Sequence, residues 1–166
     1  MRLRFSPDMK LTIESIPEST WGVSLAQLLP QEVWDALRKE VYGGFNYTCA
    51  ICGAKDKQLH CHEKWKWDDK KHIQYFVGFQ CLCVDCHNIK HWGRTVAVAH
   101  EENNQEIIPY LTFHFCQVNK CSVDAFSLYK VEVGHINQIR NRYRYKVDFG
   151  KFRPDLVEKV WRKQHR

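Results

Sequence analysis

The sequence predicts an α+β protein in which a β-hairpin and the helix after it form a core between flanking helices. Three observations lead to this prediction. Two Cys-x-x-Cys pairs stand 30 residues apart, period-two alternation lies between them, and segments with helical spacing occur on both sides. A chain of 166 residues, 44% of them hydrophobic, can bury one compact core. We therefore expect a single domain, 1–166, divided into an N-terminal arm with helices (1–44), a hairpin–helix core (45–95) and a helical C-terminal extension (96–166).

The N-terminal helices are indicated by start and stop signals. Ser24 has capping-box spacing before a short helix, and Pro30 precedes a second helix over 31–42 that ends at two glycines, 43–44. Apolar residues recur in the second helix at helical spacing, which favours a core-facing role: Val33, Trp34, Leu37 and Val41.

Four cysteines open and close the core segment. Cys49 and Cys52 stand in a turn before Gly53, and Cys83 and Cys86 open the expected helix. Four thiolates at this spacing suit a tetrahedral structural Zn²⁺. Buried thiols or disulfides are the alternative. The start of the chain, Met1-Arg2-Leu3-Arg4, lacks a secretory signal, so we expect a cytoplasmic protein in which metal binding is favoured over disulfides.

The hairpin is expected over 59–67 and 72–82, with a polar turn at 68–71. Alternation places four residues on one face of the first strand: His60, His62, Lys64 and Lys66. Gly78 suggests a bend in the second strand. His87 and His91 are four residues apart, so they share one helix face and can clamp an ion.

Two segments resemble motifs of the HNH nucleases. They are Leu59-His60-Cys61-His62-Glu63-Lys64 and His87-Asn88-Ile89-Lys90-His91-Trp92-Gly93-Arg94, which are similar to motifs in the nuclease domains of colicin-type DNases. The cysteine pairs resemble those of many other HNH proteins. The resemblance covers 45–95, under a third of the chain, and implies a zinc-pinned ββα-metal (treble-clef, His-Me finger) core.

The resemblance also implies roles for single residues. His62 matches the general base, while Cys61, His87 and His91 match ligands of a second divalent ion, Zn²⁺, Ni²⁺, Mn²⁺ or Mg²⁺. Two positions depart from the family pattern. Gly78 stands near the usual Asn that orients the base, where Gln74, Gln80, Asn88 or a backbone carbonyl is a substitute. Cys61 replaces an Asp or His ligand, and because neighbouring strand residues face opposite ways, His60 competes for its role.

The C-terminal extension is expected to be helical and basic. Helices are indicated over 96–102, 106–116 and 122–145. The net charge of the chain is +6, and residues 45–166 carry seven more basic than acidic side chains. Expected nucleic-acid contacts are Lys64, Lys66, Arg94, Arg140, Arg142, Arg144 and Lys146, although a solvated helix end explains the last four equally well.

The sequence therefore favours a metal-dependent HNH-type endonuclease or nickase that acts on DNA, double-stranded DNA above all. A catalytically inactive zinc protein that binds nucleic acid or a protein partner is the alternative. No apolar run approaches the roughly 20 residues that span a bilayer, so no membrane partner is expected. A homodimer is compatible with the sequence but is not indicated by it.

Overall fold

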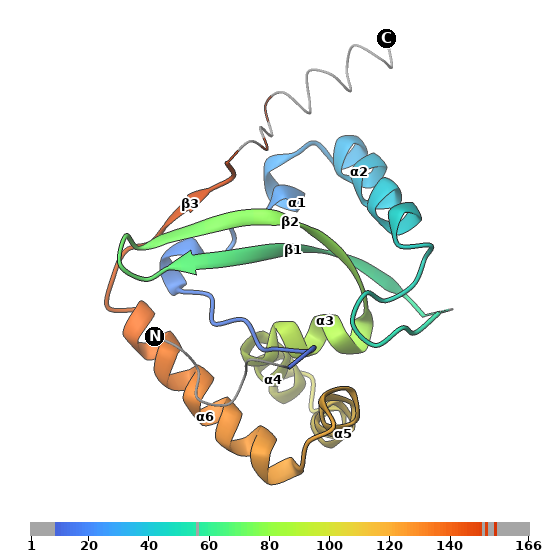
Figure 1. The fold of residues 1–166 in the computed structure, drawn as a ribbon, viewed down its shortest axis with the longest axis vertical. Coiled ribbons are helices and arrows are strands. Elements are labelled where there is room, and N and C mark those ends of the chain that lie inside the picture. Colours follow the sequence, from blue (N-terminus) through green and yellow to red (C-terminus); the bar gives the residue numbers. More distant parts are fainter. Residues whose placement is uncertain (1–8, 56, 151, 153–154, 156–166) are drawn as a thin grey trace.

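An antiparallel hairpin crosses the middle of the molecule (Figure 1). It consists of β1 (Leu59–Asp68) and β2 (Ile73–Cys83) in a computed structural model that describes residues 9–55, 57–150, 152 and 155. The Asp68 carboxylate closes the turn by accepting hydrogen bonds from the amides of Lys70 and Lys71, each at 3.0 Å. The pairing register passes from Lys64–Gly78 to Trp65–Phe76, and the shift lies beside Gly78, whose φ is +135°.

A short third strand, β3 (Lys146–Asp148), pairs in parallel with β2, so the sheet order is β1-β2-β3. A stretch of 62 intervening residues separates the two parallel strands along the chain and consists mainly of helices. This long connection is what parallel pairing requires, because a tight turn can join only antiparallel strands.

One face of the hairpin is covered by the N-terminal helices (Figure 1). These are η1 (Glu18–Thr20), α1 (Leu25–Leu28) and α2 (Gln31–Gly44). Their core contains Leu25, Leu29 and Val33, packed against aromatic side chains that include Phe76 and Phe79. Ser24 does not cap α1 through its side chain; the amide of Leu25 donates instead to the Glu63 carboxylate on β1, at 2.6 Å. A residue of the hairpin thus fixes the start of this helix.

The second face carries the larger core and the remaining helices. They are α3 (Val84–Lys90), α4 (Trp92–Glu101), α5 (Ile107–Asn119) and α6 (Val123–Arg140). Leu82, Ile89, Phe115, Phe126 and Tyr129 form the centre of this core, which also includes Leu11 from the N-terminal segment and the buried cysteines. The hairpin is therefore packed on both faces, and α3 follows β2 without an intervening loop.

The predicted α+β class is confirmed by these helices and this small sheet. The hairpin and the helices at 31–42, 96–102 and 106–116 lie close to where the sequence placed them. The predicted helix over 122–145 is wrong at its end: α6 stops at Arg140, and a turn and β3 follow. Among the described helices, none has both the length and the apolar character needed to cross a membrane.

Candidate metal centres

The four predicted zinc ligands lie together at one end of the hairpin. The Sγ atoms of Cys49, Cys52, Cys83 and Cys86 are all within 4.8 Å of one another. The Cys49–Gly53 turn is closed by a hydrogen bond from the Gly53 amide to the Cys49 carbonyl, at 3.0 Å, and φ of +75° at residue 53 explains the glycine there. The Ala50 amide donates to Cys81 on β2, which attaches this turn to the sheet.

The acid–base chemistry of these thiols fits a cation. Hydrogen bonds from the Cys83 and Cys86 thiols lower the pKa of Cys49. The same contacts raise the pKa of Cys83 to about 12 and also raise the pKa of Cys86. Without a positive charge the group therefore favours one thiolate, at Cys49, and keeps the thiols of Cys83 and Cys86 protonated. A bound Zn²⁺ would remove this conflict, because it stabilises all four thiolates at once.

The alternative of a disulfide within this group does not fit the distances. The Sγ atoms of Cys52 and Cys83 are 3.6 Å apart, whereas a disulfide bond is about 2.05 Å long. All eight cysteines are free thiols. The described geometry therefore suits a metal site.

His114 on α5 is a neighbour of this centre that the sequence analysis missed. Its Nε2 atom lies 3.3 Å from the Cys86 Sγ, and it also forms a group with Cys83 and Asp85. Outer groups of this kind orient metal ligands and tune their charge. No local pattern marks His114 in the sequence, because its contact depends on how α5 packs against α3.

A second group is made of three histidines: His62 on β1, His87 on α3, and His91, which caps the end of α3 and precedes α4. Ligand atoms of His62, His87 and His91 lie within 4.8 Å of one another. The ring centroids are 5.4 Å apart for His62 and His87, 5.0 Å for His62 and His91, and 4.8 Å for His87 and His91. His60 adds a fourth ring, stacked on His87 at 4.4 Å. The i, i+4 pair, one residue in α3 and one that caps its end, is thus completed by a histidine from β1.

Burial keeps three of these rings, those of His60, His87 and His91, neutral. Burial, together with the neighbouring His91, lowers the pKa of His87 to about 2. Burial, together with His62, lowers the pKa of His91 to about 4, and burial also lowers the pKa of His60. Neutral imidazole is the form that binds metal ions. Two buried atoms at this site lack a hydrogen-bond partner within the described structure, Nε2 of His60 and Oε2 of Glu14. Three neutral imidazoles with unsatisfied polar atoms beside them fit a divalent transition-metal ion.

Cys61 does not join this group, contrary to the role that the resemblance implied. His60 and His62 contact the rings on α3, whereas Glu63 reaches α1 on the opposite face of the hairpin. Cys61 lies two residues before Glu63 on the same strand, so its side chain points to the same face as that of Glu63. Its cross-strand partner is Cys81. Burial, followed by the charge of Glu63, raises the pKa of its thiol to about 12. The third side chain of the group is His62.

The side chain that contacts the His62 ring is also one the sequence did not indicate. Nε2 of His62 lies 3.0 Å from Oε1 of Glu14, a buried carboxylate in the N-terminal segment. Of the expected substitutes for the family's Asn, Gln74 is occupied in the core by a 2.7 Å hydrogen bond from Thr20, and Asn88 lies on α3. Gln80 is the cross-strand partner of His62.

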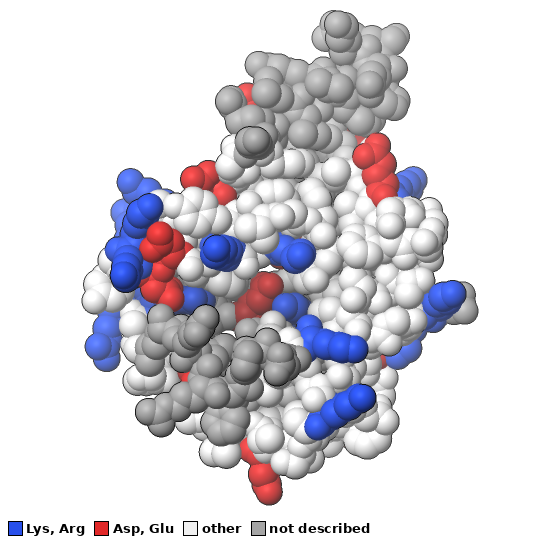
Figure 2. Space-filling view, viewed as in Figure 1, with Lys and Arg blue, Asp and Glu red and all other residues white. Residues whose placement is uncertain are grey.

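Basic side chains lie near the histidines. Lys64, Lys66 and Arg94 are exposed. Arg94 is close enough to add to the effect of burial in lowering the pKa of His60, and Lys64 adds to burial in lowering the pKa of Lys90. Figure 2 shows Lys and Arg side chains over the hairpin and over the helices below it. Exposed positive charge therefore lies near the histidine group, from Lys64 on β1 and Arg94 on α4.

The remaining predicted nucleic-acid contacts differ in exposure. Arg142, Arg144 and Lys146 are exposed in the turn after α6 and in β3. Arg140 is 9% exposed and makes structural contacts instead, so its predicted role is corrected. Its Nε donates to Asp69 at 2.8 Å, its Nη1 donates to the Ser15 carbonyl at 2.6 Å, and its guanidinium lies 4.6 Å from the Trp67 ring centroid.

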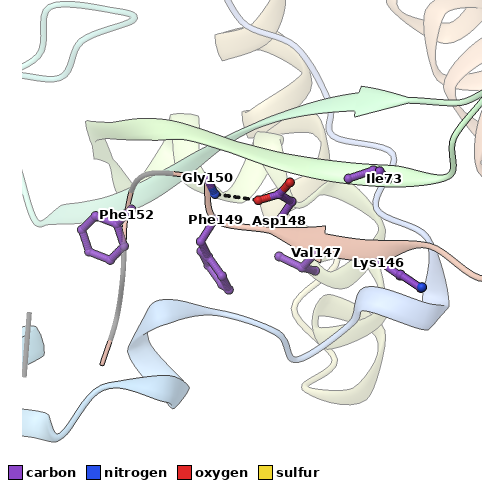
Figure 3. Close-up of a pocket in the computed structure, with 7 residues that line it drawn as sticks. All are labelled: Ile73, Lys146, Val147, Asp148, Phe149, Gly150 and Phe152. Atoms are coloured by element: carbon purple, nitrogen blue, oxygen red, sulfur yellow. Dashed lines mark hydrogen bonds between the residues drawn. The ribbon is translucent and has the colours of Figure 1, made fainter. Parts of the chain in front are cut away.

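A cavity of about 420 Å³ lies beside β3, away from both metal centres (Figure 3). Its lining includes Ile73, Lys146, Asp148 and Phe149, and none of the histidines or zinc-binding cysteines contributes to it. The Gly150 amide donates to the Asp148 carboxylate at 2.7 Å within this region. The cavity therefore adds no group to the candidate centres.

Comparison with known proteins gives no significant match to a family model, to a curated protein or to a solved structure. The similarity to HNH nucleases thus rests on the local motifs alone.

Proposed function

We propose that the protein is a metal-dependent endonuclease or nickase that hydrolyses phosphodiester bonds in DNA, with a divalent ion held by His62, His87 and His91. The observation that carries the proposal is the group of three imidazoles whose ligand atoms lie within 4.8 Å of one another, beside exposed basic residues. When bound, the ion would polarise the scissile phosphate and stabilise the leaving oxygen.

His60 is the proposed general base in place of His62. The His62 ring is only 3% exposed, and its Nε2 is engaged by Glu14. His60 is half-buried and lies on the same face, and its Nε2, although buried, has no hydrogen-bond partner among the described residues. Burial lowers the pKa of His60, which favours a neutral ring, and a neutral imidazole can accept a proton from the attacking water.

Charge around the site supports an anionic polymer as substrate. Lys64 and Arg94 flank the histidines, and Lys66 follows on the same strand. Arg142, Arg144 and Lys146 extend the positive surface toward the hairpin turn, at the opposite end of β1 from the cysteines. Contacts of this type bind phosphates without reading the base sequence.

The test is cleavage of supercoiled plasmid and single-stranded DNA with Mg²⁺, Mn²⁺, Ni²⁺ or Zn²⁺. His91→Ala should lose the second ion and activity together. His60→Ala should keep the ion and DNA affinity but lose cleavage by about 10²- to 10⁴-fold, the usual contribution of a positioned base. His100→Ala, an exposed histidine on α4, is the matched control and should cleave as wild type does.

Absence of cleavage by the wild type with all four ions would exclude the enzyme. Undiminished cleavage by His60→Ala would be compatible with an endonuclease but would show that His60 is not its general base. His62, the residue that the family motif matches, would then be the general base.

A non-catalytic zinc protein that binds nucleic acid or a protein partner is the second candidate. The 3% exposure of His62 favours it, because a closed histidine site needs no access for substrate. Two tightly held Zn²⁺ ions per chain, together with DNA binding that produces no strand breaks, would support this function.

A further inference from the structure

Glu14 is a buried charge in a segment that lies outside the hairpin–helix core and 48 residues before its partner. Its side chain is 7% exposed, and Oε1 lies 3.0 Å from Nε2 of His62. A buried carboxylate is costly unless it is paired, so its position needs an explanation beyond packing.

Lys90 on α3 holds this segment in place. The Glu14 amide donates to the Lys90 carbonyl at 2.9 Å, and Lys90 Nζ donates to the Thr12 hydroxyl at 2.9 Å. Nζ also lies 3.8 Å from Oε1 of Glu14. Leu11 is fully buried in the main core, and its amide and carbonyl both bond to the Asn119 side chain. The carboxylate is therefore fixed from several directions rather than placed by a mobile arm.

The contact with Glu14 favours one tautomer of the His62 ring. An ionised carboxylate only accepts hydrogen bonds, so Nε2 must be the nitrogen that carries hydrogen. In a neutral ring this leaves the lone pair on Nδ1. A carboxylate behind a histidine ligand commonly fixes the tautomer and increases ligand basicity.

We propose that Glu14 is a positioning residue that holds His62 as the Nε2–H tautomer, so that His62 offers Nδ1 to the ion in the histidine group. The inference rests on the proposed function, since it assigns a role within the same site. It also supplies the orienting group for which the sequence offers no Asn near Gly78.

The experiment uses the full chain with its structural zinc in place. Long-range ¹H–¹⁵N NMR correlations report the tautomer of each histidine before a second ion is added. Co²⁺ then serves as the probe ion, with affinity measured from its visible absorption. Absence of thiolate charge-transfer bands shows that zinc remains in the cysteine site. Glu63→Gln is the matched control, because it neutralises a buried carboxylate on the opposite face of the same strand.

In the wild type we expect an Nε2–H tautomer at His62. Glu14→Ala should weaken Co²⁺ binding by about 10- to 100-fold, the usual effect of removing such a partner. Glu14→Gln keeps a carbonyl acceptor for Nε2–H, so it should retain the tautomer and bind Co²⁺ better than Glu14→Ala. Glu63→Gln should bind as the wild type does.

An Nδ1–H tautomer in the wild type would overturn the inference, even if Glu14→Ala does not fold. Unchanged Co²⁺ affinity in a folded Glu14→Ala protein would overturn it as well. Because neither measurement involves DNA, a wild type that shows the expected tautomer and Co²⁺ affinities but cuts nothing would uphold Glu14 and refute hydrolysis.

Discussion

At the residue scale, Arg140 illustrates how one basic side chain can be structural among neighbours that are exposed. Its sequence context, Arg-Asn-Arg-Tyr-Arg, gives no sign that it differs from Arg142 and Arg144. The fold buries it because α6 ends there, beside the hairpin turn that carries Asp69. Tyr145 donates to the same carboxylate at 2.8 Å, so Asp69 ties the end of α6 and the residue before β3 to the hairpin.

We expect Asp69→Asn to destabilise the fold in a pH-dependent way. Partial burial raises the pKa of Asp69, but hydrogen bonds from Arg140 and Tyr145 outweigh it and lower the pKa below its ordinary value. The stabilisation is therefore fully present above the ordinary carboxyl pKa and is lost as pH falls through the lowered value. At pH 7 the cost should be about 1 kcal/mol, because the carboxylate is 35% exposed.

Urea unfolding of both proteins at neutral pH and at a pH below the ordinary carboxyl range measures this difference. Asp35→Asn is the control, since it removes an i, i+3 pair with Arg38 on the surface of α2 and should cost only a few tenths of a kcal/mol (about 0.3). A difference for Asp69→Asn that persists unchanged at low pH would contradict the assignment.

At the element scale, the turn at 49–53 and the start of α3 depend on each other. Each supplies two of the four Sγ atoms, and the turn contacts β2 through the single hydrogen bond from Ala50 to Cys81 that links their backbones among the described residues. A bound Zn²⁺ would join the two segments with far greater strength than that hydrogen bond.

Cys52→Ala should therefore lose zinc and lower the melting temperature sharply, since structural zinc can contribute on the order of 10 kcal/mol. Metal content by mass spectrometry and thermal unfolding by circular dichroism report the two effects. Cys61→Ala is the control: it is a half-buried thiol on the same hairpin that belongs to neither metal group, and it should keep its zinc. Full retention of zinc by Cys52→Ala would contradict the proposal that the four cysteines bind the metal.

Contacts within one element or between adjacent elements could be predicted from local sequence patterns. The i, i+4 spacing of His87 and His91 and the alternation that puts His60 and His62 on one face both describe contacts made within or between adjacent elements. The sequence was insufficient where the partner is remote. Glu14, His114 and the parallel pairing of β3 with β2 depend on how distant segments pack, and no periodicity records that. The motif match predicted Cys61 as a metal ligand, but alternation along β1 turns its side chain to the face opposite His60 and His62.

At the scale of the whole molecule, the two faces of the hairpin differ in their charge and in what covers them. The face with the histidines is bordered by Lys64 and Arg94, whereas the opposite face is covered by α1 and α2 and the aromatic core. If DNA binds beside the histidines, the affinity should fall with salt by about 0.9 log unit per log unit of salt for each phosphate neutralised.

The double variant Lys64→Ala/Arg94→Ala should reduce that salt slope by about 2 × 0.9, as measured by fluorescence anisotropy of a labelled duplex. Lys39→Ala, which removes an exposed charge from α2, is the control and should leave the slope unchanged. A slope that falls only when Arg142 and Arg144 are replaced would place the DNA near the hairpin turn instead.

Cys83 is both the last residue of β2 and the residue that caps the start of α3. Zinc held by Cys83 and Cys86 would thus set the angle between β2 and α3. His87 stands on α3, and His62 stands on β1, where it pairs with Gln80 of β2. Zinc among the cysteines would then preorganise the histidines, and by reciprocity an ion among the histidines would strengthen the equilibrium affinity for zinc by the same factor. One residue at a strand–helix junction would thereby couple the affinities of the two centres.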